Sequence, residues 1–259
     1  MKLLYIDPVG PEYFTEELKS YLHQIRDTNV EIDITPLTRG PATLEFRYYE
    51  SLVIPDIIHK VIEVERTGYD GVIIGCFYDP GLYAAREVSK IPIIGPGESS
   101  MHIAATLGYK FSIIVGRTKW ISIIMDNVVK YGFKEKFSSF KSLELDILEF
   151  QKNAKTYETM LSLSKEAIKK DSAEVIILGC TMQYSFYKKL QEELNVPVID
   201  PVISAFEYAQ FMVKLKQKFG WGHSKIGSFQ CPDIKEIKRW KIPEQYKLKD
   251  LWNNIEGGY

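Results

Sequence analysis

Residues 71–76 read GVIIGC and residues 174–180 read EVIILGC, and this repeated stretch decides the fold. Each copy is a short run of Val, Ile and Leu that ends in glycine and cysteine. Such runs are too short and too β-branched for buried helices, and they are typical of central strands in a parallel sheet covered on both faces. The chain has only three cysteines, so two of them end the same kind of strand.

The sequence that follows each cysteine is repeated as well. IPIIGP at 91–96 follows the first cysteine at almost the same distance as VPVIDP at 196–201 follows the second. Runs typical of strands, LLYID at 3–7 and FSIIV at 111–115, stand at the head of the two copies. An internal repeat of this kind predicts two lobes of the same architecture.

Helical patterns of about ten residues or more alternate with these apolar runs, which is typical of βαβ units and a parallel sheet. The sequence therefore predicts an α/β fold with two pseudo-symmetric Rossmann-like lobes, whose parallel sheets face each other across a central cleft. The first lobe spans 1–105 with Cys76, and the second spans 106–205 with Cys180. Residues 206–259 are expected to form a C-terminal helix and an irregular tail that packs on the first lobe. Helices are expected at 12–26, 50–68, 79–90, 98–108, 119–132, 151–170, 184–194 and 201–220.

Composition excludes several classes of protein. The chain has 259 residues, 45% of them hydrophobic, and a formal net charge of −1. No basic field favours nucleic acid or an anionic membrane. No window approaches the roughly 18 apolar residues of a membrane span, and the N-terminus lacks a signal-peptide core. Three cysteines in a chain of this size indicate reduced thiols, so a cytoplasmic location is expected.

The position of the two cysteines points to chemistry. Ligands of open α/β sheets bind beyond the carboxyl ends of the strands, where Cys76 and Cys180 are expected to lie. A helix that starts directly after each cysteine would lower the thiol pKa toward neutrality, and Gly75 and Gly179 would let a ligand approach the backbone. Two such thiols suit proton transfer on opposite faces of one carbon, with no metal or organic cofactor. Cys231 has no such context and is interpreted as structural.

Three stretches resemble a known family. GCFYDPGLYAAREVSKIPIIG resembles the first cysteine motif of hydantoin and allantoin racemases, in the aspartate/glutamate racemase superfamily. RGPATLEFRYYESLVIP resembles their Gly-Pro-x-x-Ile-Glu stretch, and EVIILGCTMQ resembles the second Gly-Cys of the superfamily. The resemblance covers about residues 1–215. It implies a two-lobe fold, cofactor-independent racemisation of a small molecule by two cysteines, and self-association as a dimer or larger homo-oligomer.

The sequence departs from the family at three places. DPVG at 7–10 stands where Asn-Pro-Asn is usual, and Asp7 would disfavour an anionic substrate or accept a hydrogen bond from a ring N–H. Tyr78 stands where glycine is common, so it narrows the pocket or offers a hydroxyl. At 181–183, Thr-Met-Gln replaces the usual Ala-Gly-Met. Thr181 is shared with aspartate and glutamate racemases, but the Glu that often follows in those enzymes is absent.

These patterns define a set of candidate residues. Loops at strand ends, the backbone N–H of Phe77 and the hydroxyl of Thr118 could contact substrate, although Thr118 could equally be a helix cap. The catalytic candidates are Cys76 and Cys180. The substrate-binding candidates are Asp7, Pro8, Gly40, Pro41, Phe77, Tyr78, Thr118, Gly179 and Thr181. The four histidines follow no metal-ligand spacing, so no metal site is expected.

The leading hypothesis is a cofactor-independent racemase that acts on a 5-substituted hydantoin or allantoin. One alternative is an amino-acid racemase of the Asp/Glu type, or a related decarboxylase or isomerase. These would need a cation to hold a carboxylate, and Arg117 is the candidate. An alternative of another class is a non-catalytic protein that binds a small molecule.

Overall fold

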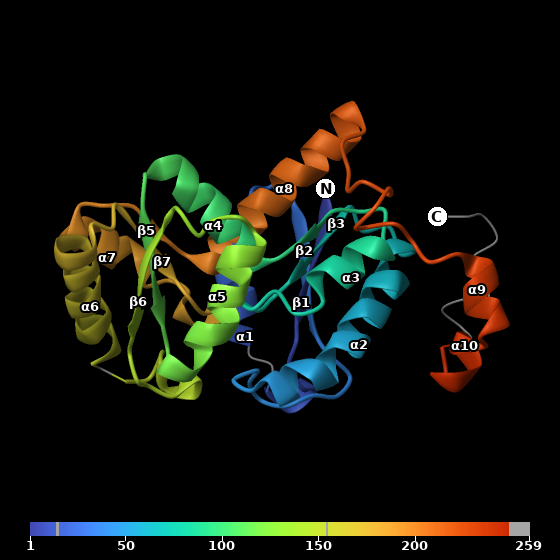
Figure 1. Cartoon of the computed structure of the whole chain (residues 1–259), viewed down its shortest axis with the longest axis horizontal. Helices are drawn as coiled ribbons and strands as arrows, with labels where there is room; N and C mark the ends of the chain where they lie inside the picture. Colours follow the sequence, from blue (N-terminus) through green and yellow to red (C-terminus); the bar gives the residue numbers. More distant parts are fainter. Residues whose placement is uncertain (14–15, 154, 249–259) are drawn as a thin grey trace.

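The computed structural model describes residues 1–13, 16–153 and 155–248, and it contains two parallel four-stranded sheets. The first sheet has the order β2-β1-β3-β4 and the second has the order β6-β5-β7-β8. The two lobes lie side by side in Figure 1. The strands are β1 (Lys2–Asp7), β2 (Glu31–Pro36), β3 (Gly71–Ile74), β4 (Ile93–Ile94), β5 (Phe111–Val115), β6 (Phe137–Ser142), β7 (Val175–Leu178) and β8 (Val198–Ile199).

The strand order confirms the predicted fold class and explains the internal repeat. Each lobe starts in the middle of its sheet, moves to one edge and returns past the first strand to the other edge. The four residues of β3 and the four of β7 are all buried, as continuous Val, Ile and Leu runs require of central strands. The two Gly-Cys pairs therefore follow equivalent central strands.

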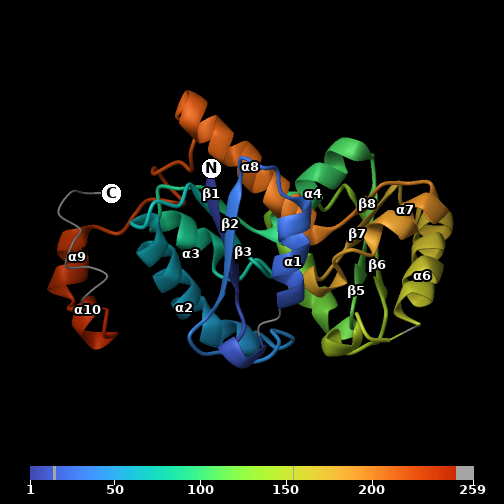
Figure 2. The same cartoon turned by 180° about the vertical axis from the view of Figure 1, so that it is seen from behind.

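Helices cover both faces of the sheets, as Figures 1 and 2 show from opposite sides. Most begin and end within a few residues of the predicted limits. The helix predicted at 79–90 is short because Pro80 and Gly81 delay its start until Leu82. The helices are α1 (Glu16–Ile25), α2 (Arg47–Glu65), α3 (Leu82–Glu87), α4 (Pro96–Leu107), α5 (Ile121–Lys130), α6 (Thr156–Asp171), α7 (Tyr187–Leu194), α8 (Pro201–Phe219), α9 (Ile234–Arg239) and α10 (Ile242–Gln245).

Helices α4 and α8 join the lobes by crossing between them. Helix α4 follows the last strand of the first sheet but packs on β7 and β8 of the second. Helix α8 follows the last strand of the second sheet but packs on β3 and β4 of the first. The two helices also pack on each other, where the hydroxyls of Ser100 and Ser204 lie 2.7 Å apart in a buried hydrogen bond. This exchange holds the sheets in a fixed relative position.

The C-terminal part of the chain lies against the first lobe. After α8, the described residues form two short helices, α9 and α10, at one end of the molecule in Figure 1. Ile237 of α9 packs on Ile62 of α2 and on Val88. Part of the predicted tail, 249–259, lies outside the described residues, and the lobe boundaries at 105 and 205 stay predictions. None of the described helices is long and apolar enough to cross a membrane.

Candidate active site

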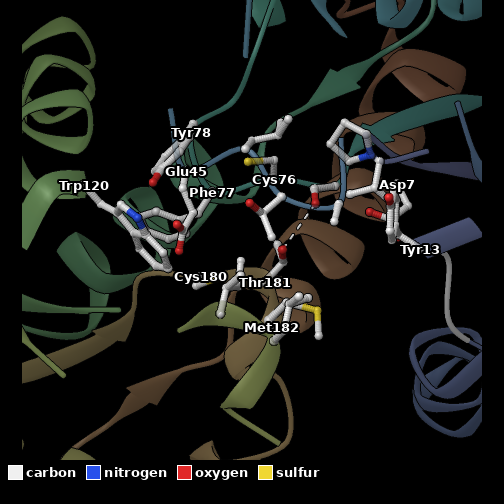
Figure 3. Close-up of a pocket in the computed structure, with 18 of the residues that line it drawn as sticks. Asp7, Tyr13, Glu45, Cys76, Phe77, Tyr78, Trp120, Cys180, Thr181 and Met182 are labelled. Carbon is white, nitrogen blue, oxygen red and sulfur yellow. Dashed lines mark hydrogen bonds between the residues drawn. The ribbon is translucent and has the colours of Figure 1, made fainter. Parts of the chain in front are cut away.

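Cys76 and Cys180 lie at the carboxyl ends of β3 and β7 and line the same pocket (Figure 3). Both are free thiols. Cys76 is partly exposed, and only 7% of the surface of Cys180 is exposed. Each comes two residues after its strand ends, so the symmetry of the lobes brings together two cysteines that are about a hundred positions apart in the sequence.

The glycine before each cysteine has the same backbone contact. The N–H of Gly75 donates to the carbonyl of Ile6, and the N–H of Gly179 donates to the carbonyl of Ile114, both at 2.8 Å. A Cβ on Gly75 would lie 2.1 Å from the ring of Tyr5, and one on Gly179 would lie 2.9 Å from the Ile114 carbonyl oxygen. Both glycines line the pocket, but the space beside them is occupied by the neighbouring strand. The expectation that a ligand can approach the backbone at these glycines stays a prediction, and the structure adds that the neighbouring strand leaves no space for a side chain at either position.

A buried carboxylate holds the loop after Cys76. Asp79 accepts hydrogen bonds from the backbone N–H groups of Gly97 and Glu98, at 2.9 and 2.8 Å, and from the hydroxyl of Tyr131. These bonds cap the first turn of α4, because Gly95 leaves the position before the helix without a side chain. The carboxylate thus links the Cys76 loop to the helix that crosses to the second lobe.

Asp200 has the same capping role in the second lobe. It caps α8 by accepting from the N–H of Val202 at 2.9 Å, and it also accepts from the N–H of Ser185 and the hydroxyl of Tyr21, both at 2.8 Å. The loop after Cys180 is therefore joined to α8 in the same way. Both cysteine loops are positioned by buried hydrogen bonds before any ligand binds.

One hydrogen bond joins the lobes at the site itself. The hydroxyl of Thr181, the residue after Cys180, donates to the carbonyl of Gly75, the residue before Cys76, at 3.3 Å. This contact fixes the spacing of the two cysteine loops. A fixed spacing is what a substrate held between the two thiols would need.

The sequence-based expectation for the thiol pKa values is wrong in direction. No regular helix starts directly at either cysteine: α3 begins only at Leu82, and Cys180 is followed by a single 3-10 turn. Burial raises the pKa of Cys76 well above its usual range, against a backbone hydrogen bond from Tyr78 that lowers it. Burial also raises the pKa of Cys180 to about 12, while a backbone hydrogen bond from Met182 lowers it. Loss of hydration exceeds the effect of the few N–H groups.

The charged side chains that line the pocket are all acidic. Of the described residues that line it, Asp7 and Glu45 carry carboxyl groups, and none is Lys, Arg or His. Burial raises the pKa of Asp7 to about 7. Arg117, the candidate carboxylate clamp, is 42% exposed and pairs with Glu45 at 3.0 Å instead of lining the pocket. The pocket is therefore poorly suited to a free carboxylate.

Eight of the candidate residues line the pocket, and three do not. Gly40 and Pro41 lie behind the wall, where the Pro41 carbonyl accepts from the N–H of Gly10 at 3.2 Å. The exposed Thr118 donates its hydroxyl to Glu144 at 2.5 Å, away from the pocket. The lining candidates are Asp7, Pro8, Cys76, Phe77, Tyr78, Gly179, Cys180 and Thr181.

Several residues that line the pocket lie outside the set of candidates. Tyr13, Glu45, Trp120 and Met182 all line the pocket, and Figure 3 shows Glu45 and Trp120 on the side away from Asp7. Glu45 lies in the stretch RGPATLEF, whose acidic residue is part of the family motif, so that motif could have pointed to it. Trp120 carries no local signal, because a Trp beside a helical pattern is typical of ordinary core packing.

Within 1–13, 16–153 and 155–248, no group of three or more His, Cys, Asp or Glu side chains is placed to hold a metal ion. The site thus consists of two thiols, two carboxyl groups and aromatic walls at the junction of two matching α/β lobes. This arrangement defines the class: a pseudo-symmetric α/β protein with a pair of facing loops that each carry a cysteine.

Comparison with known proteins gives the family. The model of the Asp/Glu/Hydantoin racemase family matches residues 3–209, which is most of the chain. The chain belongs to this family of racemases, as the resemblance of its cysteine motifs implied.

Known relatives align with this chain over nearly its whole length. A hydantoin racemase of Pseudomonas sp. (strain NS671) is 31% identical over 237 residues, which are 91% of this chain and 94% of the relative. A hydantoin racemase of Paenarthrobacter aurescens is 32% identical, with 91% and 99% covered. The structure of an allantoin racemase from Klebsiella pneumoniae superposes with a TM-score of 0.82 at 27% identity, covering 90% of this chain and 94% of that one.

Proposed function

We propose that this protein is a cofactor-independent racemase of a 5-substituted hydantoin or of allantoin, with Cys76 and Cys180 as its two bases. The observation that carries the proposal is that both thiols line one pocket, each at the end of an equivalent strand. The hydantoin and allantoin racemases among its relatives support the substrate class.

The reaction needs only the movement of protons. The C5–H of a hydantoin is acidic because its electron pair can delocalise into the neighbouring carbonyl. One cysteine, as thiolate, takes this proton, and the opposite cysteine gives its S–H proton to the other face of C5. The carbon is inverted and the two sulfurs have exchanged protonation states, so the enzyme is ready for the reverse direction. Atoms and charge balance without a redox step.

The charge of the pocket favours a neutral ring over a free amino acid. An amino-acid racemase would bind an α-carboxylate, whereas the acidic lining by Asp7 and Glu45 would repel one. A hydantoin has no free carboxylate and offers N–H groups that carboxylate oxygens can accept. The amino-acid alternative and the decarboxylase or isomerase alternative both lose their candidate clamp, because Arg117 is engaged with Glu45.

The test is proton exchange during racemisation. We expect the protein to racemise a single enantiomer of a 5-substituted hydantoin or of allantoin in D2O, with deuterium appearing at C5 in the inverted product. Optical rotation and proton NMR measure the two processes. L-aspartate and L-glutamate serve as comparison substrates. Racemisation of these amino acids but of no hydantoin would contradict the substrate class. Tight binding of a hydantoin without proton exchange would support the non-catalytic binding protein instead.

The activity is expected to rise with pH. The raised pKa values of both thiols leave them almost entirely protonated at pH 7, and the thiolate that must take the proton grows about tenfold for each pH unit below its pKa. A plot of log kcat/KM against pH should therefore have a slope near one between about pH 6.5 and 9. A profile that is flat above pH 7 would show that a base with a low pKa removes the C5 proton.

Self-association and a cytoplasmic location stay predictions.

A further inference from the structure

Two buried polar atoms in the pocket wall lack partners, and they are of opposite kinds. Glu45 has a side chain that is 8% exposed, and its Oε1 atom accepts no hydrogen bond within the described part of the chain. Trp120 is 2% exposed, and its Nε1–H donates none there. Both residues line the pocket that holds the cysteines. A buried polar atom without a partner destabilises the protein, and a ligand with the matching group can recover that loss on binding.

Each of the two side chains is held in place by its surroundings. The Oε2 atom of Glu45 accepts from the guanidinium of Arg117 at 3.0 Å, which orients the carboxylate and leaves Oε1 available. The Trp120 ring packs edge-to-face on Tyr78 and on Phe150, with centroids 6.2 Å apart in both pairs. A Cβ on Gly116 would lie within 2.5 Å of that ring, so the glycine makes room for it. The acceptor and the donor are therefore positioned before a ligand arrives.

We propose that Glu45 and Trp120 form a paired recognition site for a neutral ring amide, in which Glu45 accepts a ring N–H and Trp120 donates to a ring carbonyl. This inference rests on the proposed function and adds the residues that select its substrate. A ureide or imide ring carries N–H and C=O groups side by side, which matches one acceptor and one donor in a single wall. An amino-acid carboxylate offers no N–H of this kind and would face the negative charge of Glu45.

The position of the pair agrees with this role. Figure 3 shows Glu45, Trp120 and Tyr78 on one side of the cysteines and Asp7 on the other. The charge of Glu45 contributes to the raised pKa values of Cys180 and Tyr78, so it lies within electrostatic reach of both. A ring held by Glu45 and Trp120 would thus have its C5 atom near the thiols.

The test uses a ligand that cannot react. 5,5-Dimethylhydantoin has no proton at C5, so its affinity reports recognition independently of racemisation. By isothermal titration calorimetry, we expect Glu45→Gln to weaken binding by about 10- to 100-fold and Trp120→Phe by about fivefold. Glu166→Gln and Trp240→Phe are the matched controls, since they remove the same groups on the surface and should leave the affinity unchanged. Thermal unfolding of all variants checks that each one folds.

Methylated rings sharpen the test. Methylation at N1 or at N3 of 5,5-dimethylhydantoin removes one N–H at a time, and one of these two probes should bind the unaltered protein at least tenfold more weakly. In Glu45→Gln that discrimination should nearly vanish, because the Arg117 guanidinium would hold the one amide oxygen and leave the NH2 group, a donor, toward the ring. If steric clash alone caused it, the variant would discriminate as before and the proposal would fall.

The outcomes separate this inference from the proposed function. Unchanged affinity for 5,5-dimethylhydantoin in both Glu45→Gln and Trp120→Phe would overturn the paired site even if racemisation is observed. Affinity that depends on both residues, in a protein that exchanges no C5 proton, would support the paired site and contradict the racemase. In an active enzyme, Glu45→Gln should raise KM for the hydantoin more than it lowers kcat.

Discussion

Serine in place of either Cys76 or Cys180 is expected to lower racemisation by about 10³-fold or more, while the fold is retained. A positioned acid or base contributes about 10²–10⁴-fold, and the serine hydroxyl is far too weak an acid to supply a useful base. Serine and cysteine have similar shapes, so packing at the two strand ends should change little. The measurement is the initial rate of optical rotation change, with circular dichroism as the check on folding.

The two variants should differ in a way that simple inactivation would not produce. If each cysteine serves one face of the carbon, Cys76→Ser and Cys180→Ser should each still exchange the C5 proton of one enantiomer with D2O, and of opposite enantiomers. Exchange without inversion in both variants would locate one base on each face. Equal residual exchange of both enantiomers in one variant would show that a single base serves both faces.

Cys231→Ser is the matched control for these variants. Cys231 is the third free thiol, and it is not among the residues that line the pocket. Its replacement should leave the rate within about twofold of the unaltered protein. Full racemase activity in Cys76→Ser or Cys180→Ser would contradict the two-base mechanism.

Gly75→Ala is expected to destabilise the protein by about 3 kcal/mol, because the added methyl group has no space. It would lie 2.1 Å from the Tyr5 ring and 2.8 Å from the Ile6 carbonyl oxygen. Tyr5 is fully buried and cannot move away. For a chain of this size the melting temperature should fall by about 10 °C. Racemase activity should fall too, since the next residue is Cys76.

Two further variants show whether this cause is the right one. Gly222→Ala is the control, since the nearest heavy atom to its added Cβ is 3.9 Å away, and it should unfold near the temperature of the unaltered protein. Tyr5→Val in combination with Gly75→Ala should recover part of the loss, because the ring is removed while the Ile6 carbonyl stays. A Gly75→Ala protein that melts normally would show that the strand end is more adaptable than its contacts indicate.

Much of the fold could be predicted from local patterns. The burial of β3 and β7 is encoded in their own continuous Val, Ile and Leu residues, and the repeat of the segments after Cys76 and Cys180 predicted matching lobes. The Pro-Gly pair after Asp79 indicates that α3 starts late. It therefore also indicates that no helix N-terminus lies at the thiol of Cys76. The wrong direction of the thiol pKa values has another source, because burial depends on residues distant in the sequence.

The site was predictable only in part, for the same reason. Asp7, Tyr78 and Thr181 line the pocket because they lie at or shortly after the ends of strands, which sequence patterns locate. Thr118 also follows a strand, but its hydroxyl donates a hydrogen bond to Glu144. No local sequence pattern predicts this contact. Trp120 lines the pocket, although its own neighbourhood in the sequence resembles a core helix.

The sequence alone determined the alternation of strands and helices, the internal repeat and the two cysteines at equivalent strand ends, because these depend on residues near one another in the chain. Only the tertiary structure decided which side chains share the pocket and that α4 and α8 each pack on the opposite lobe. It also decided that Arg117 pairs with Glu45 outside the pocket lining, and that burial raises the pKa of both thiols. Hydration, charge pairing and steric exclusion act between residues that only folding brings together.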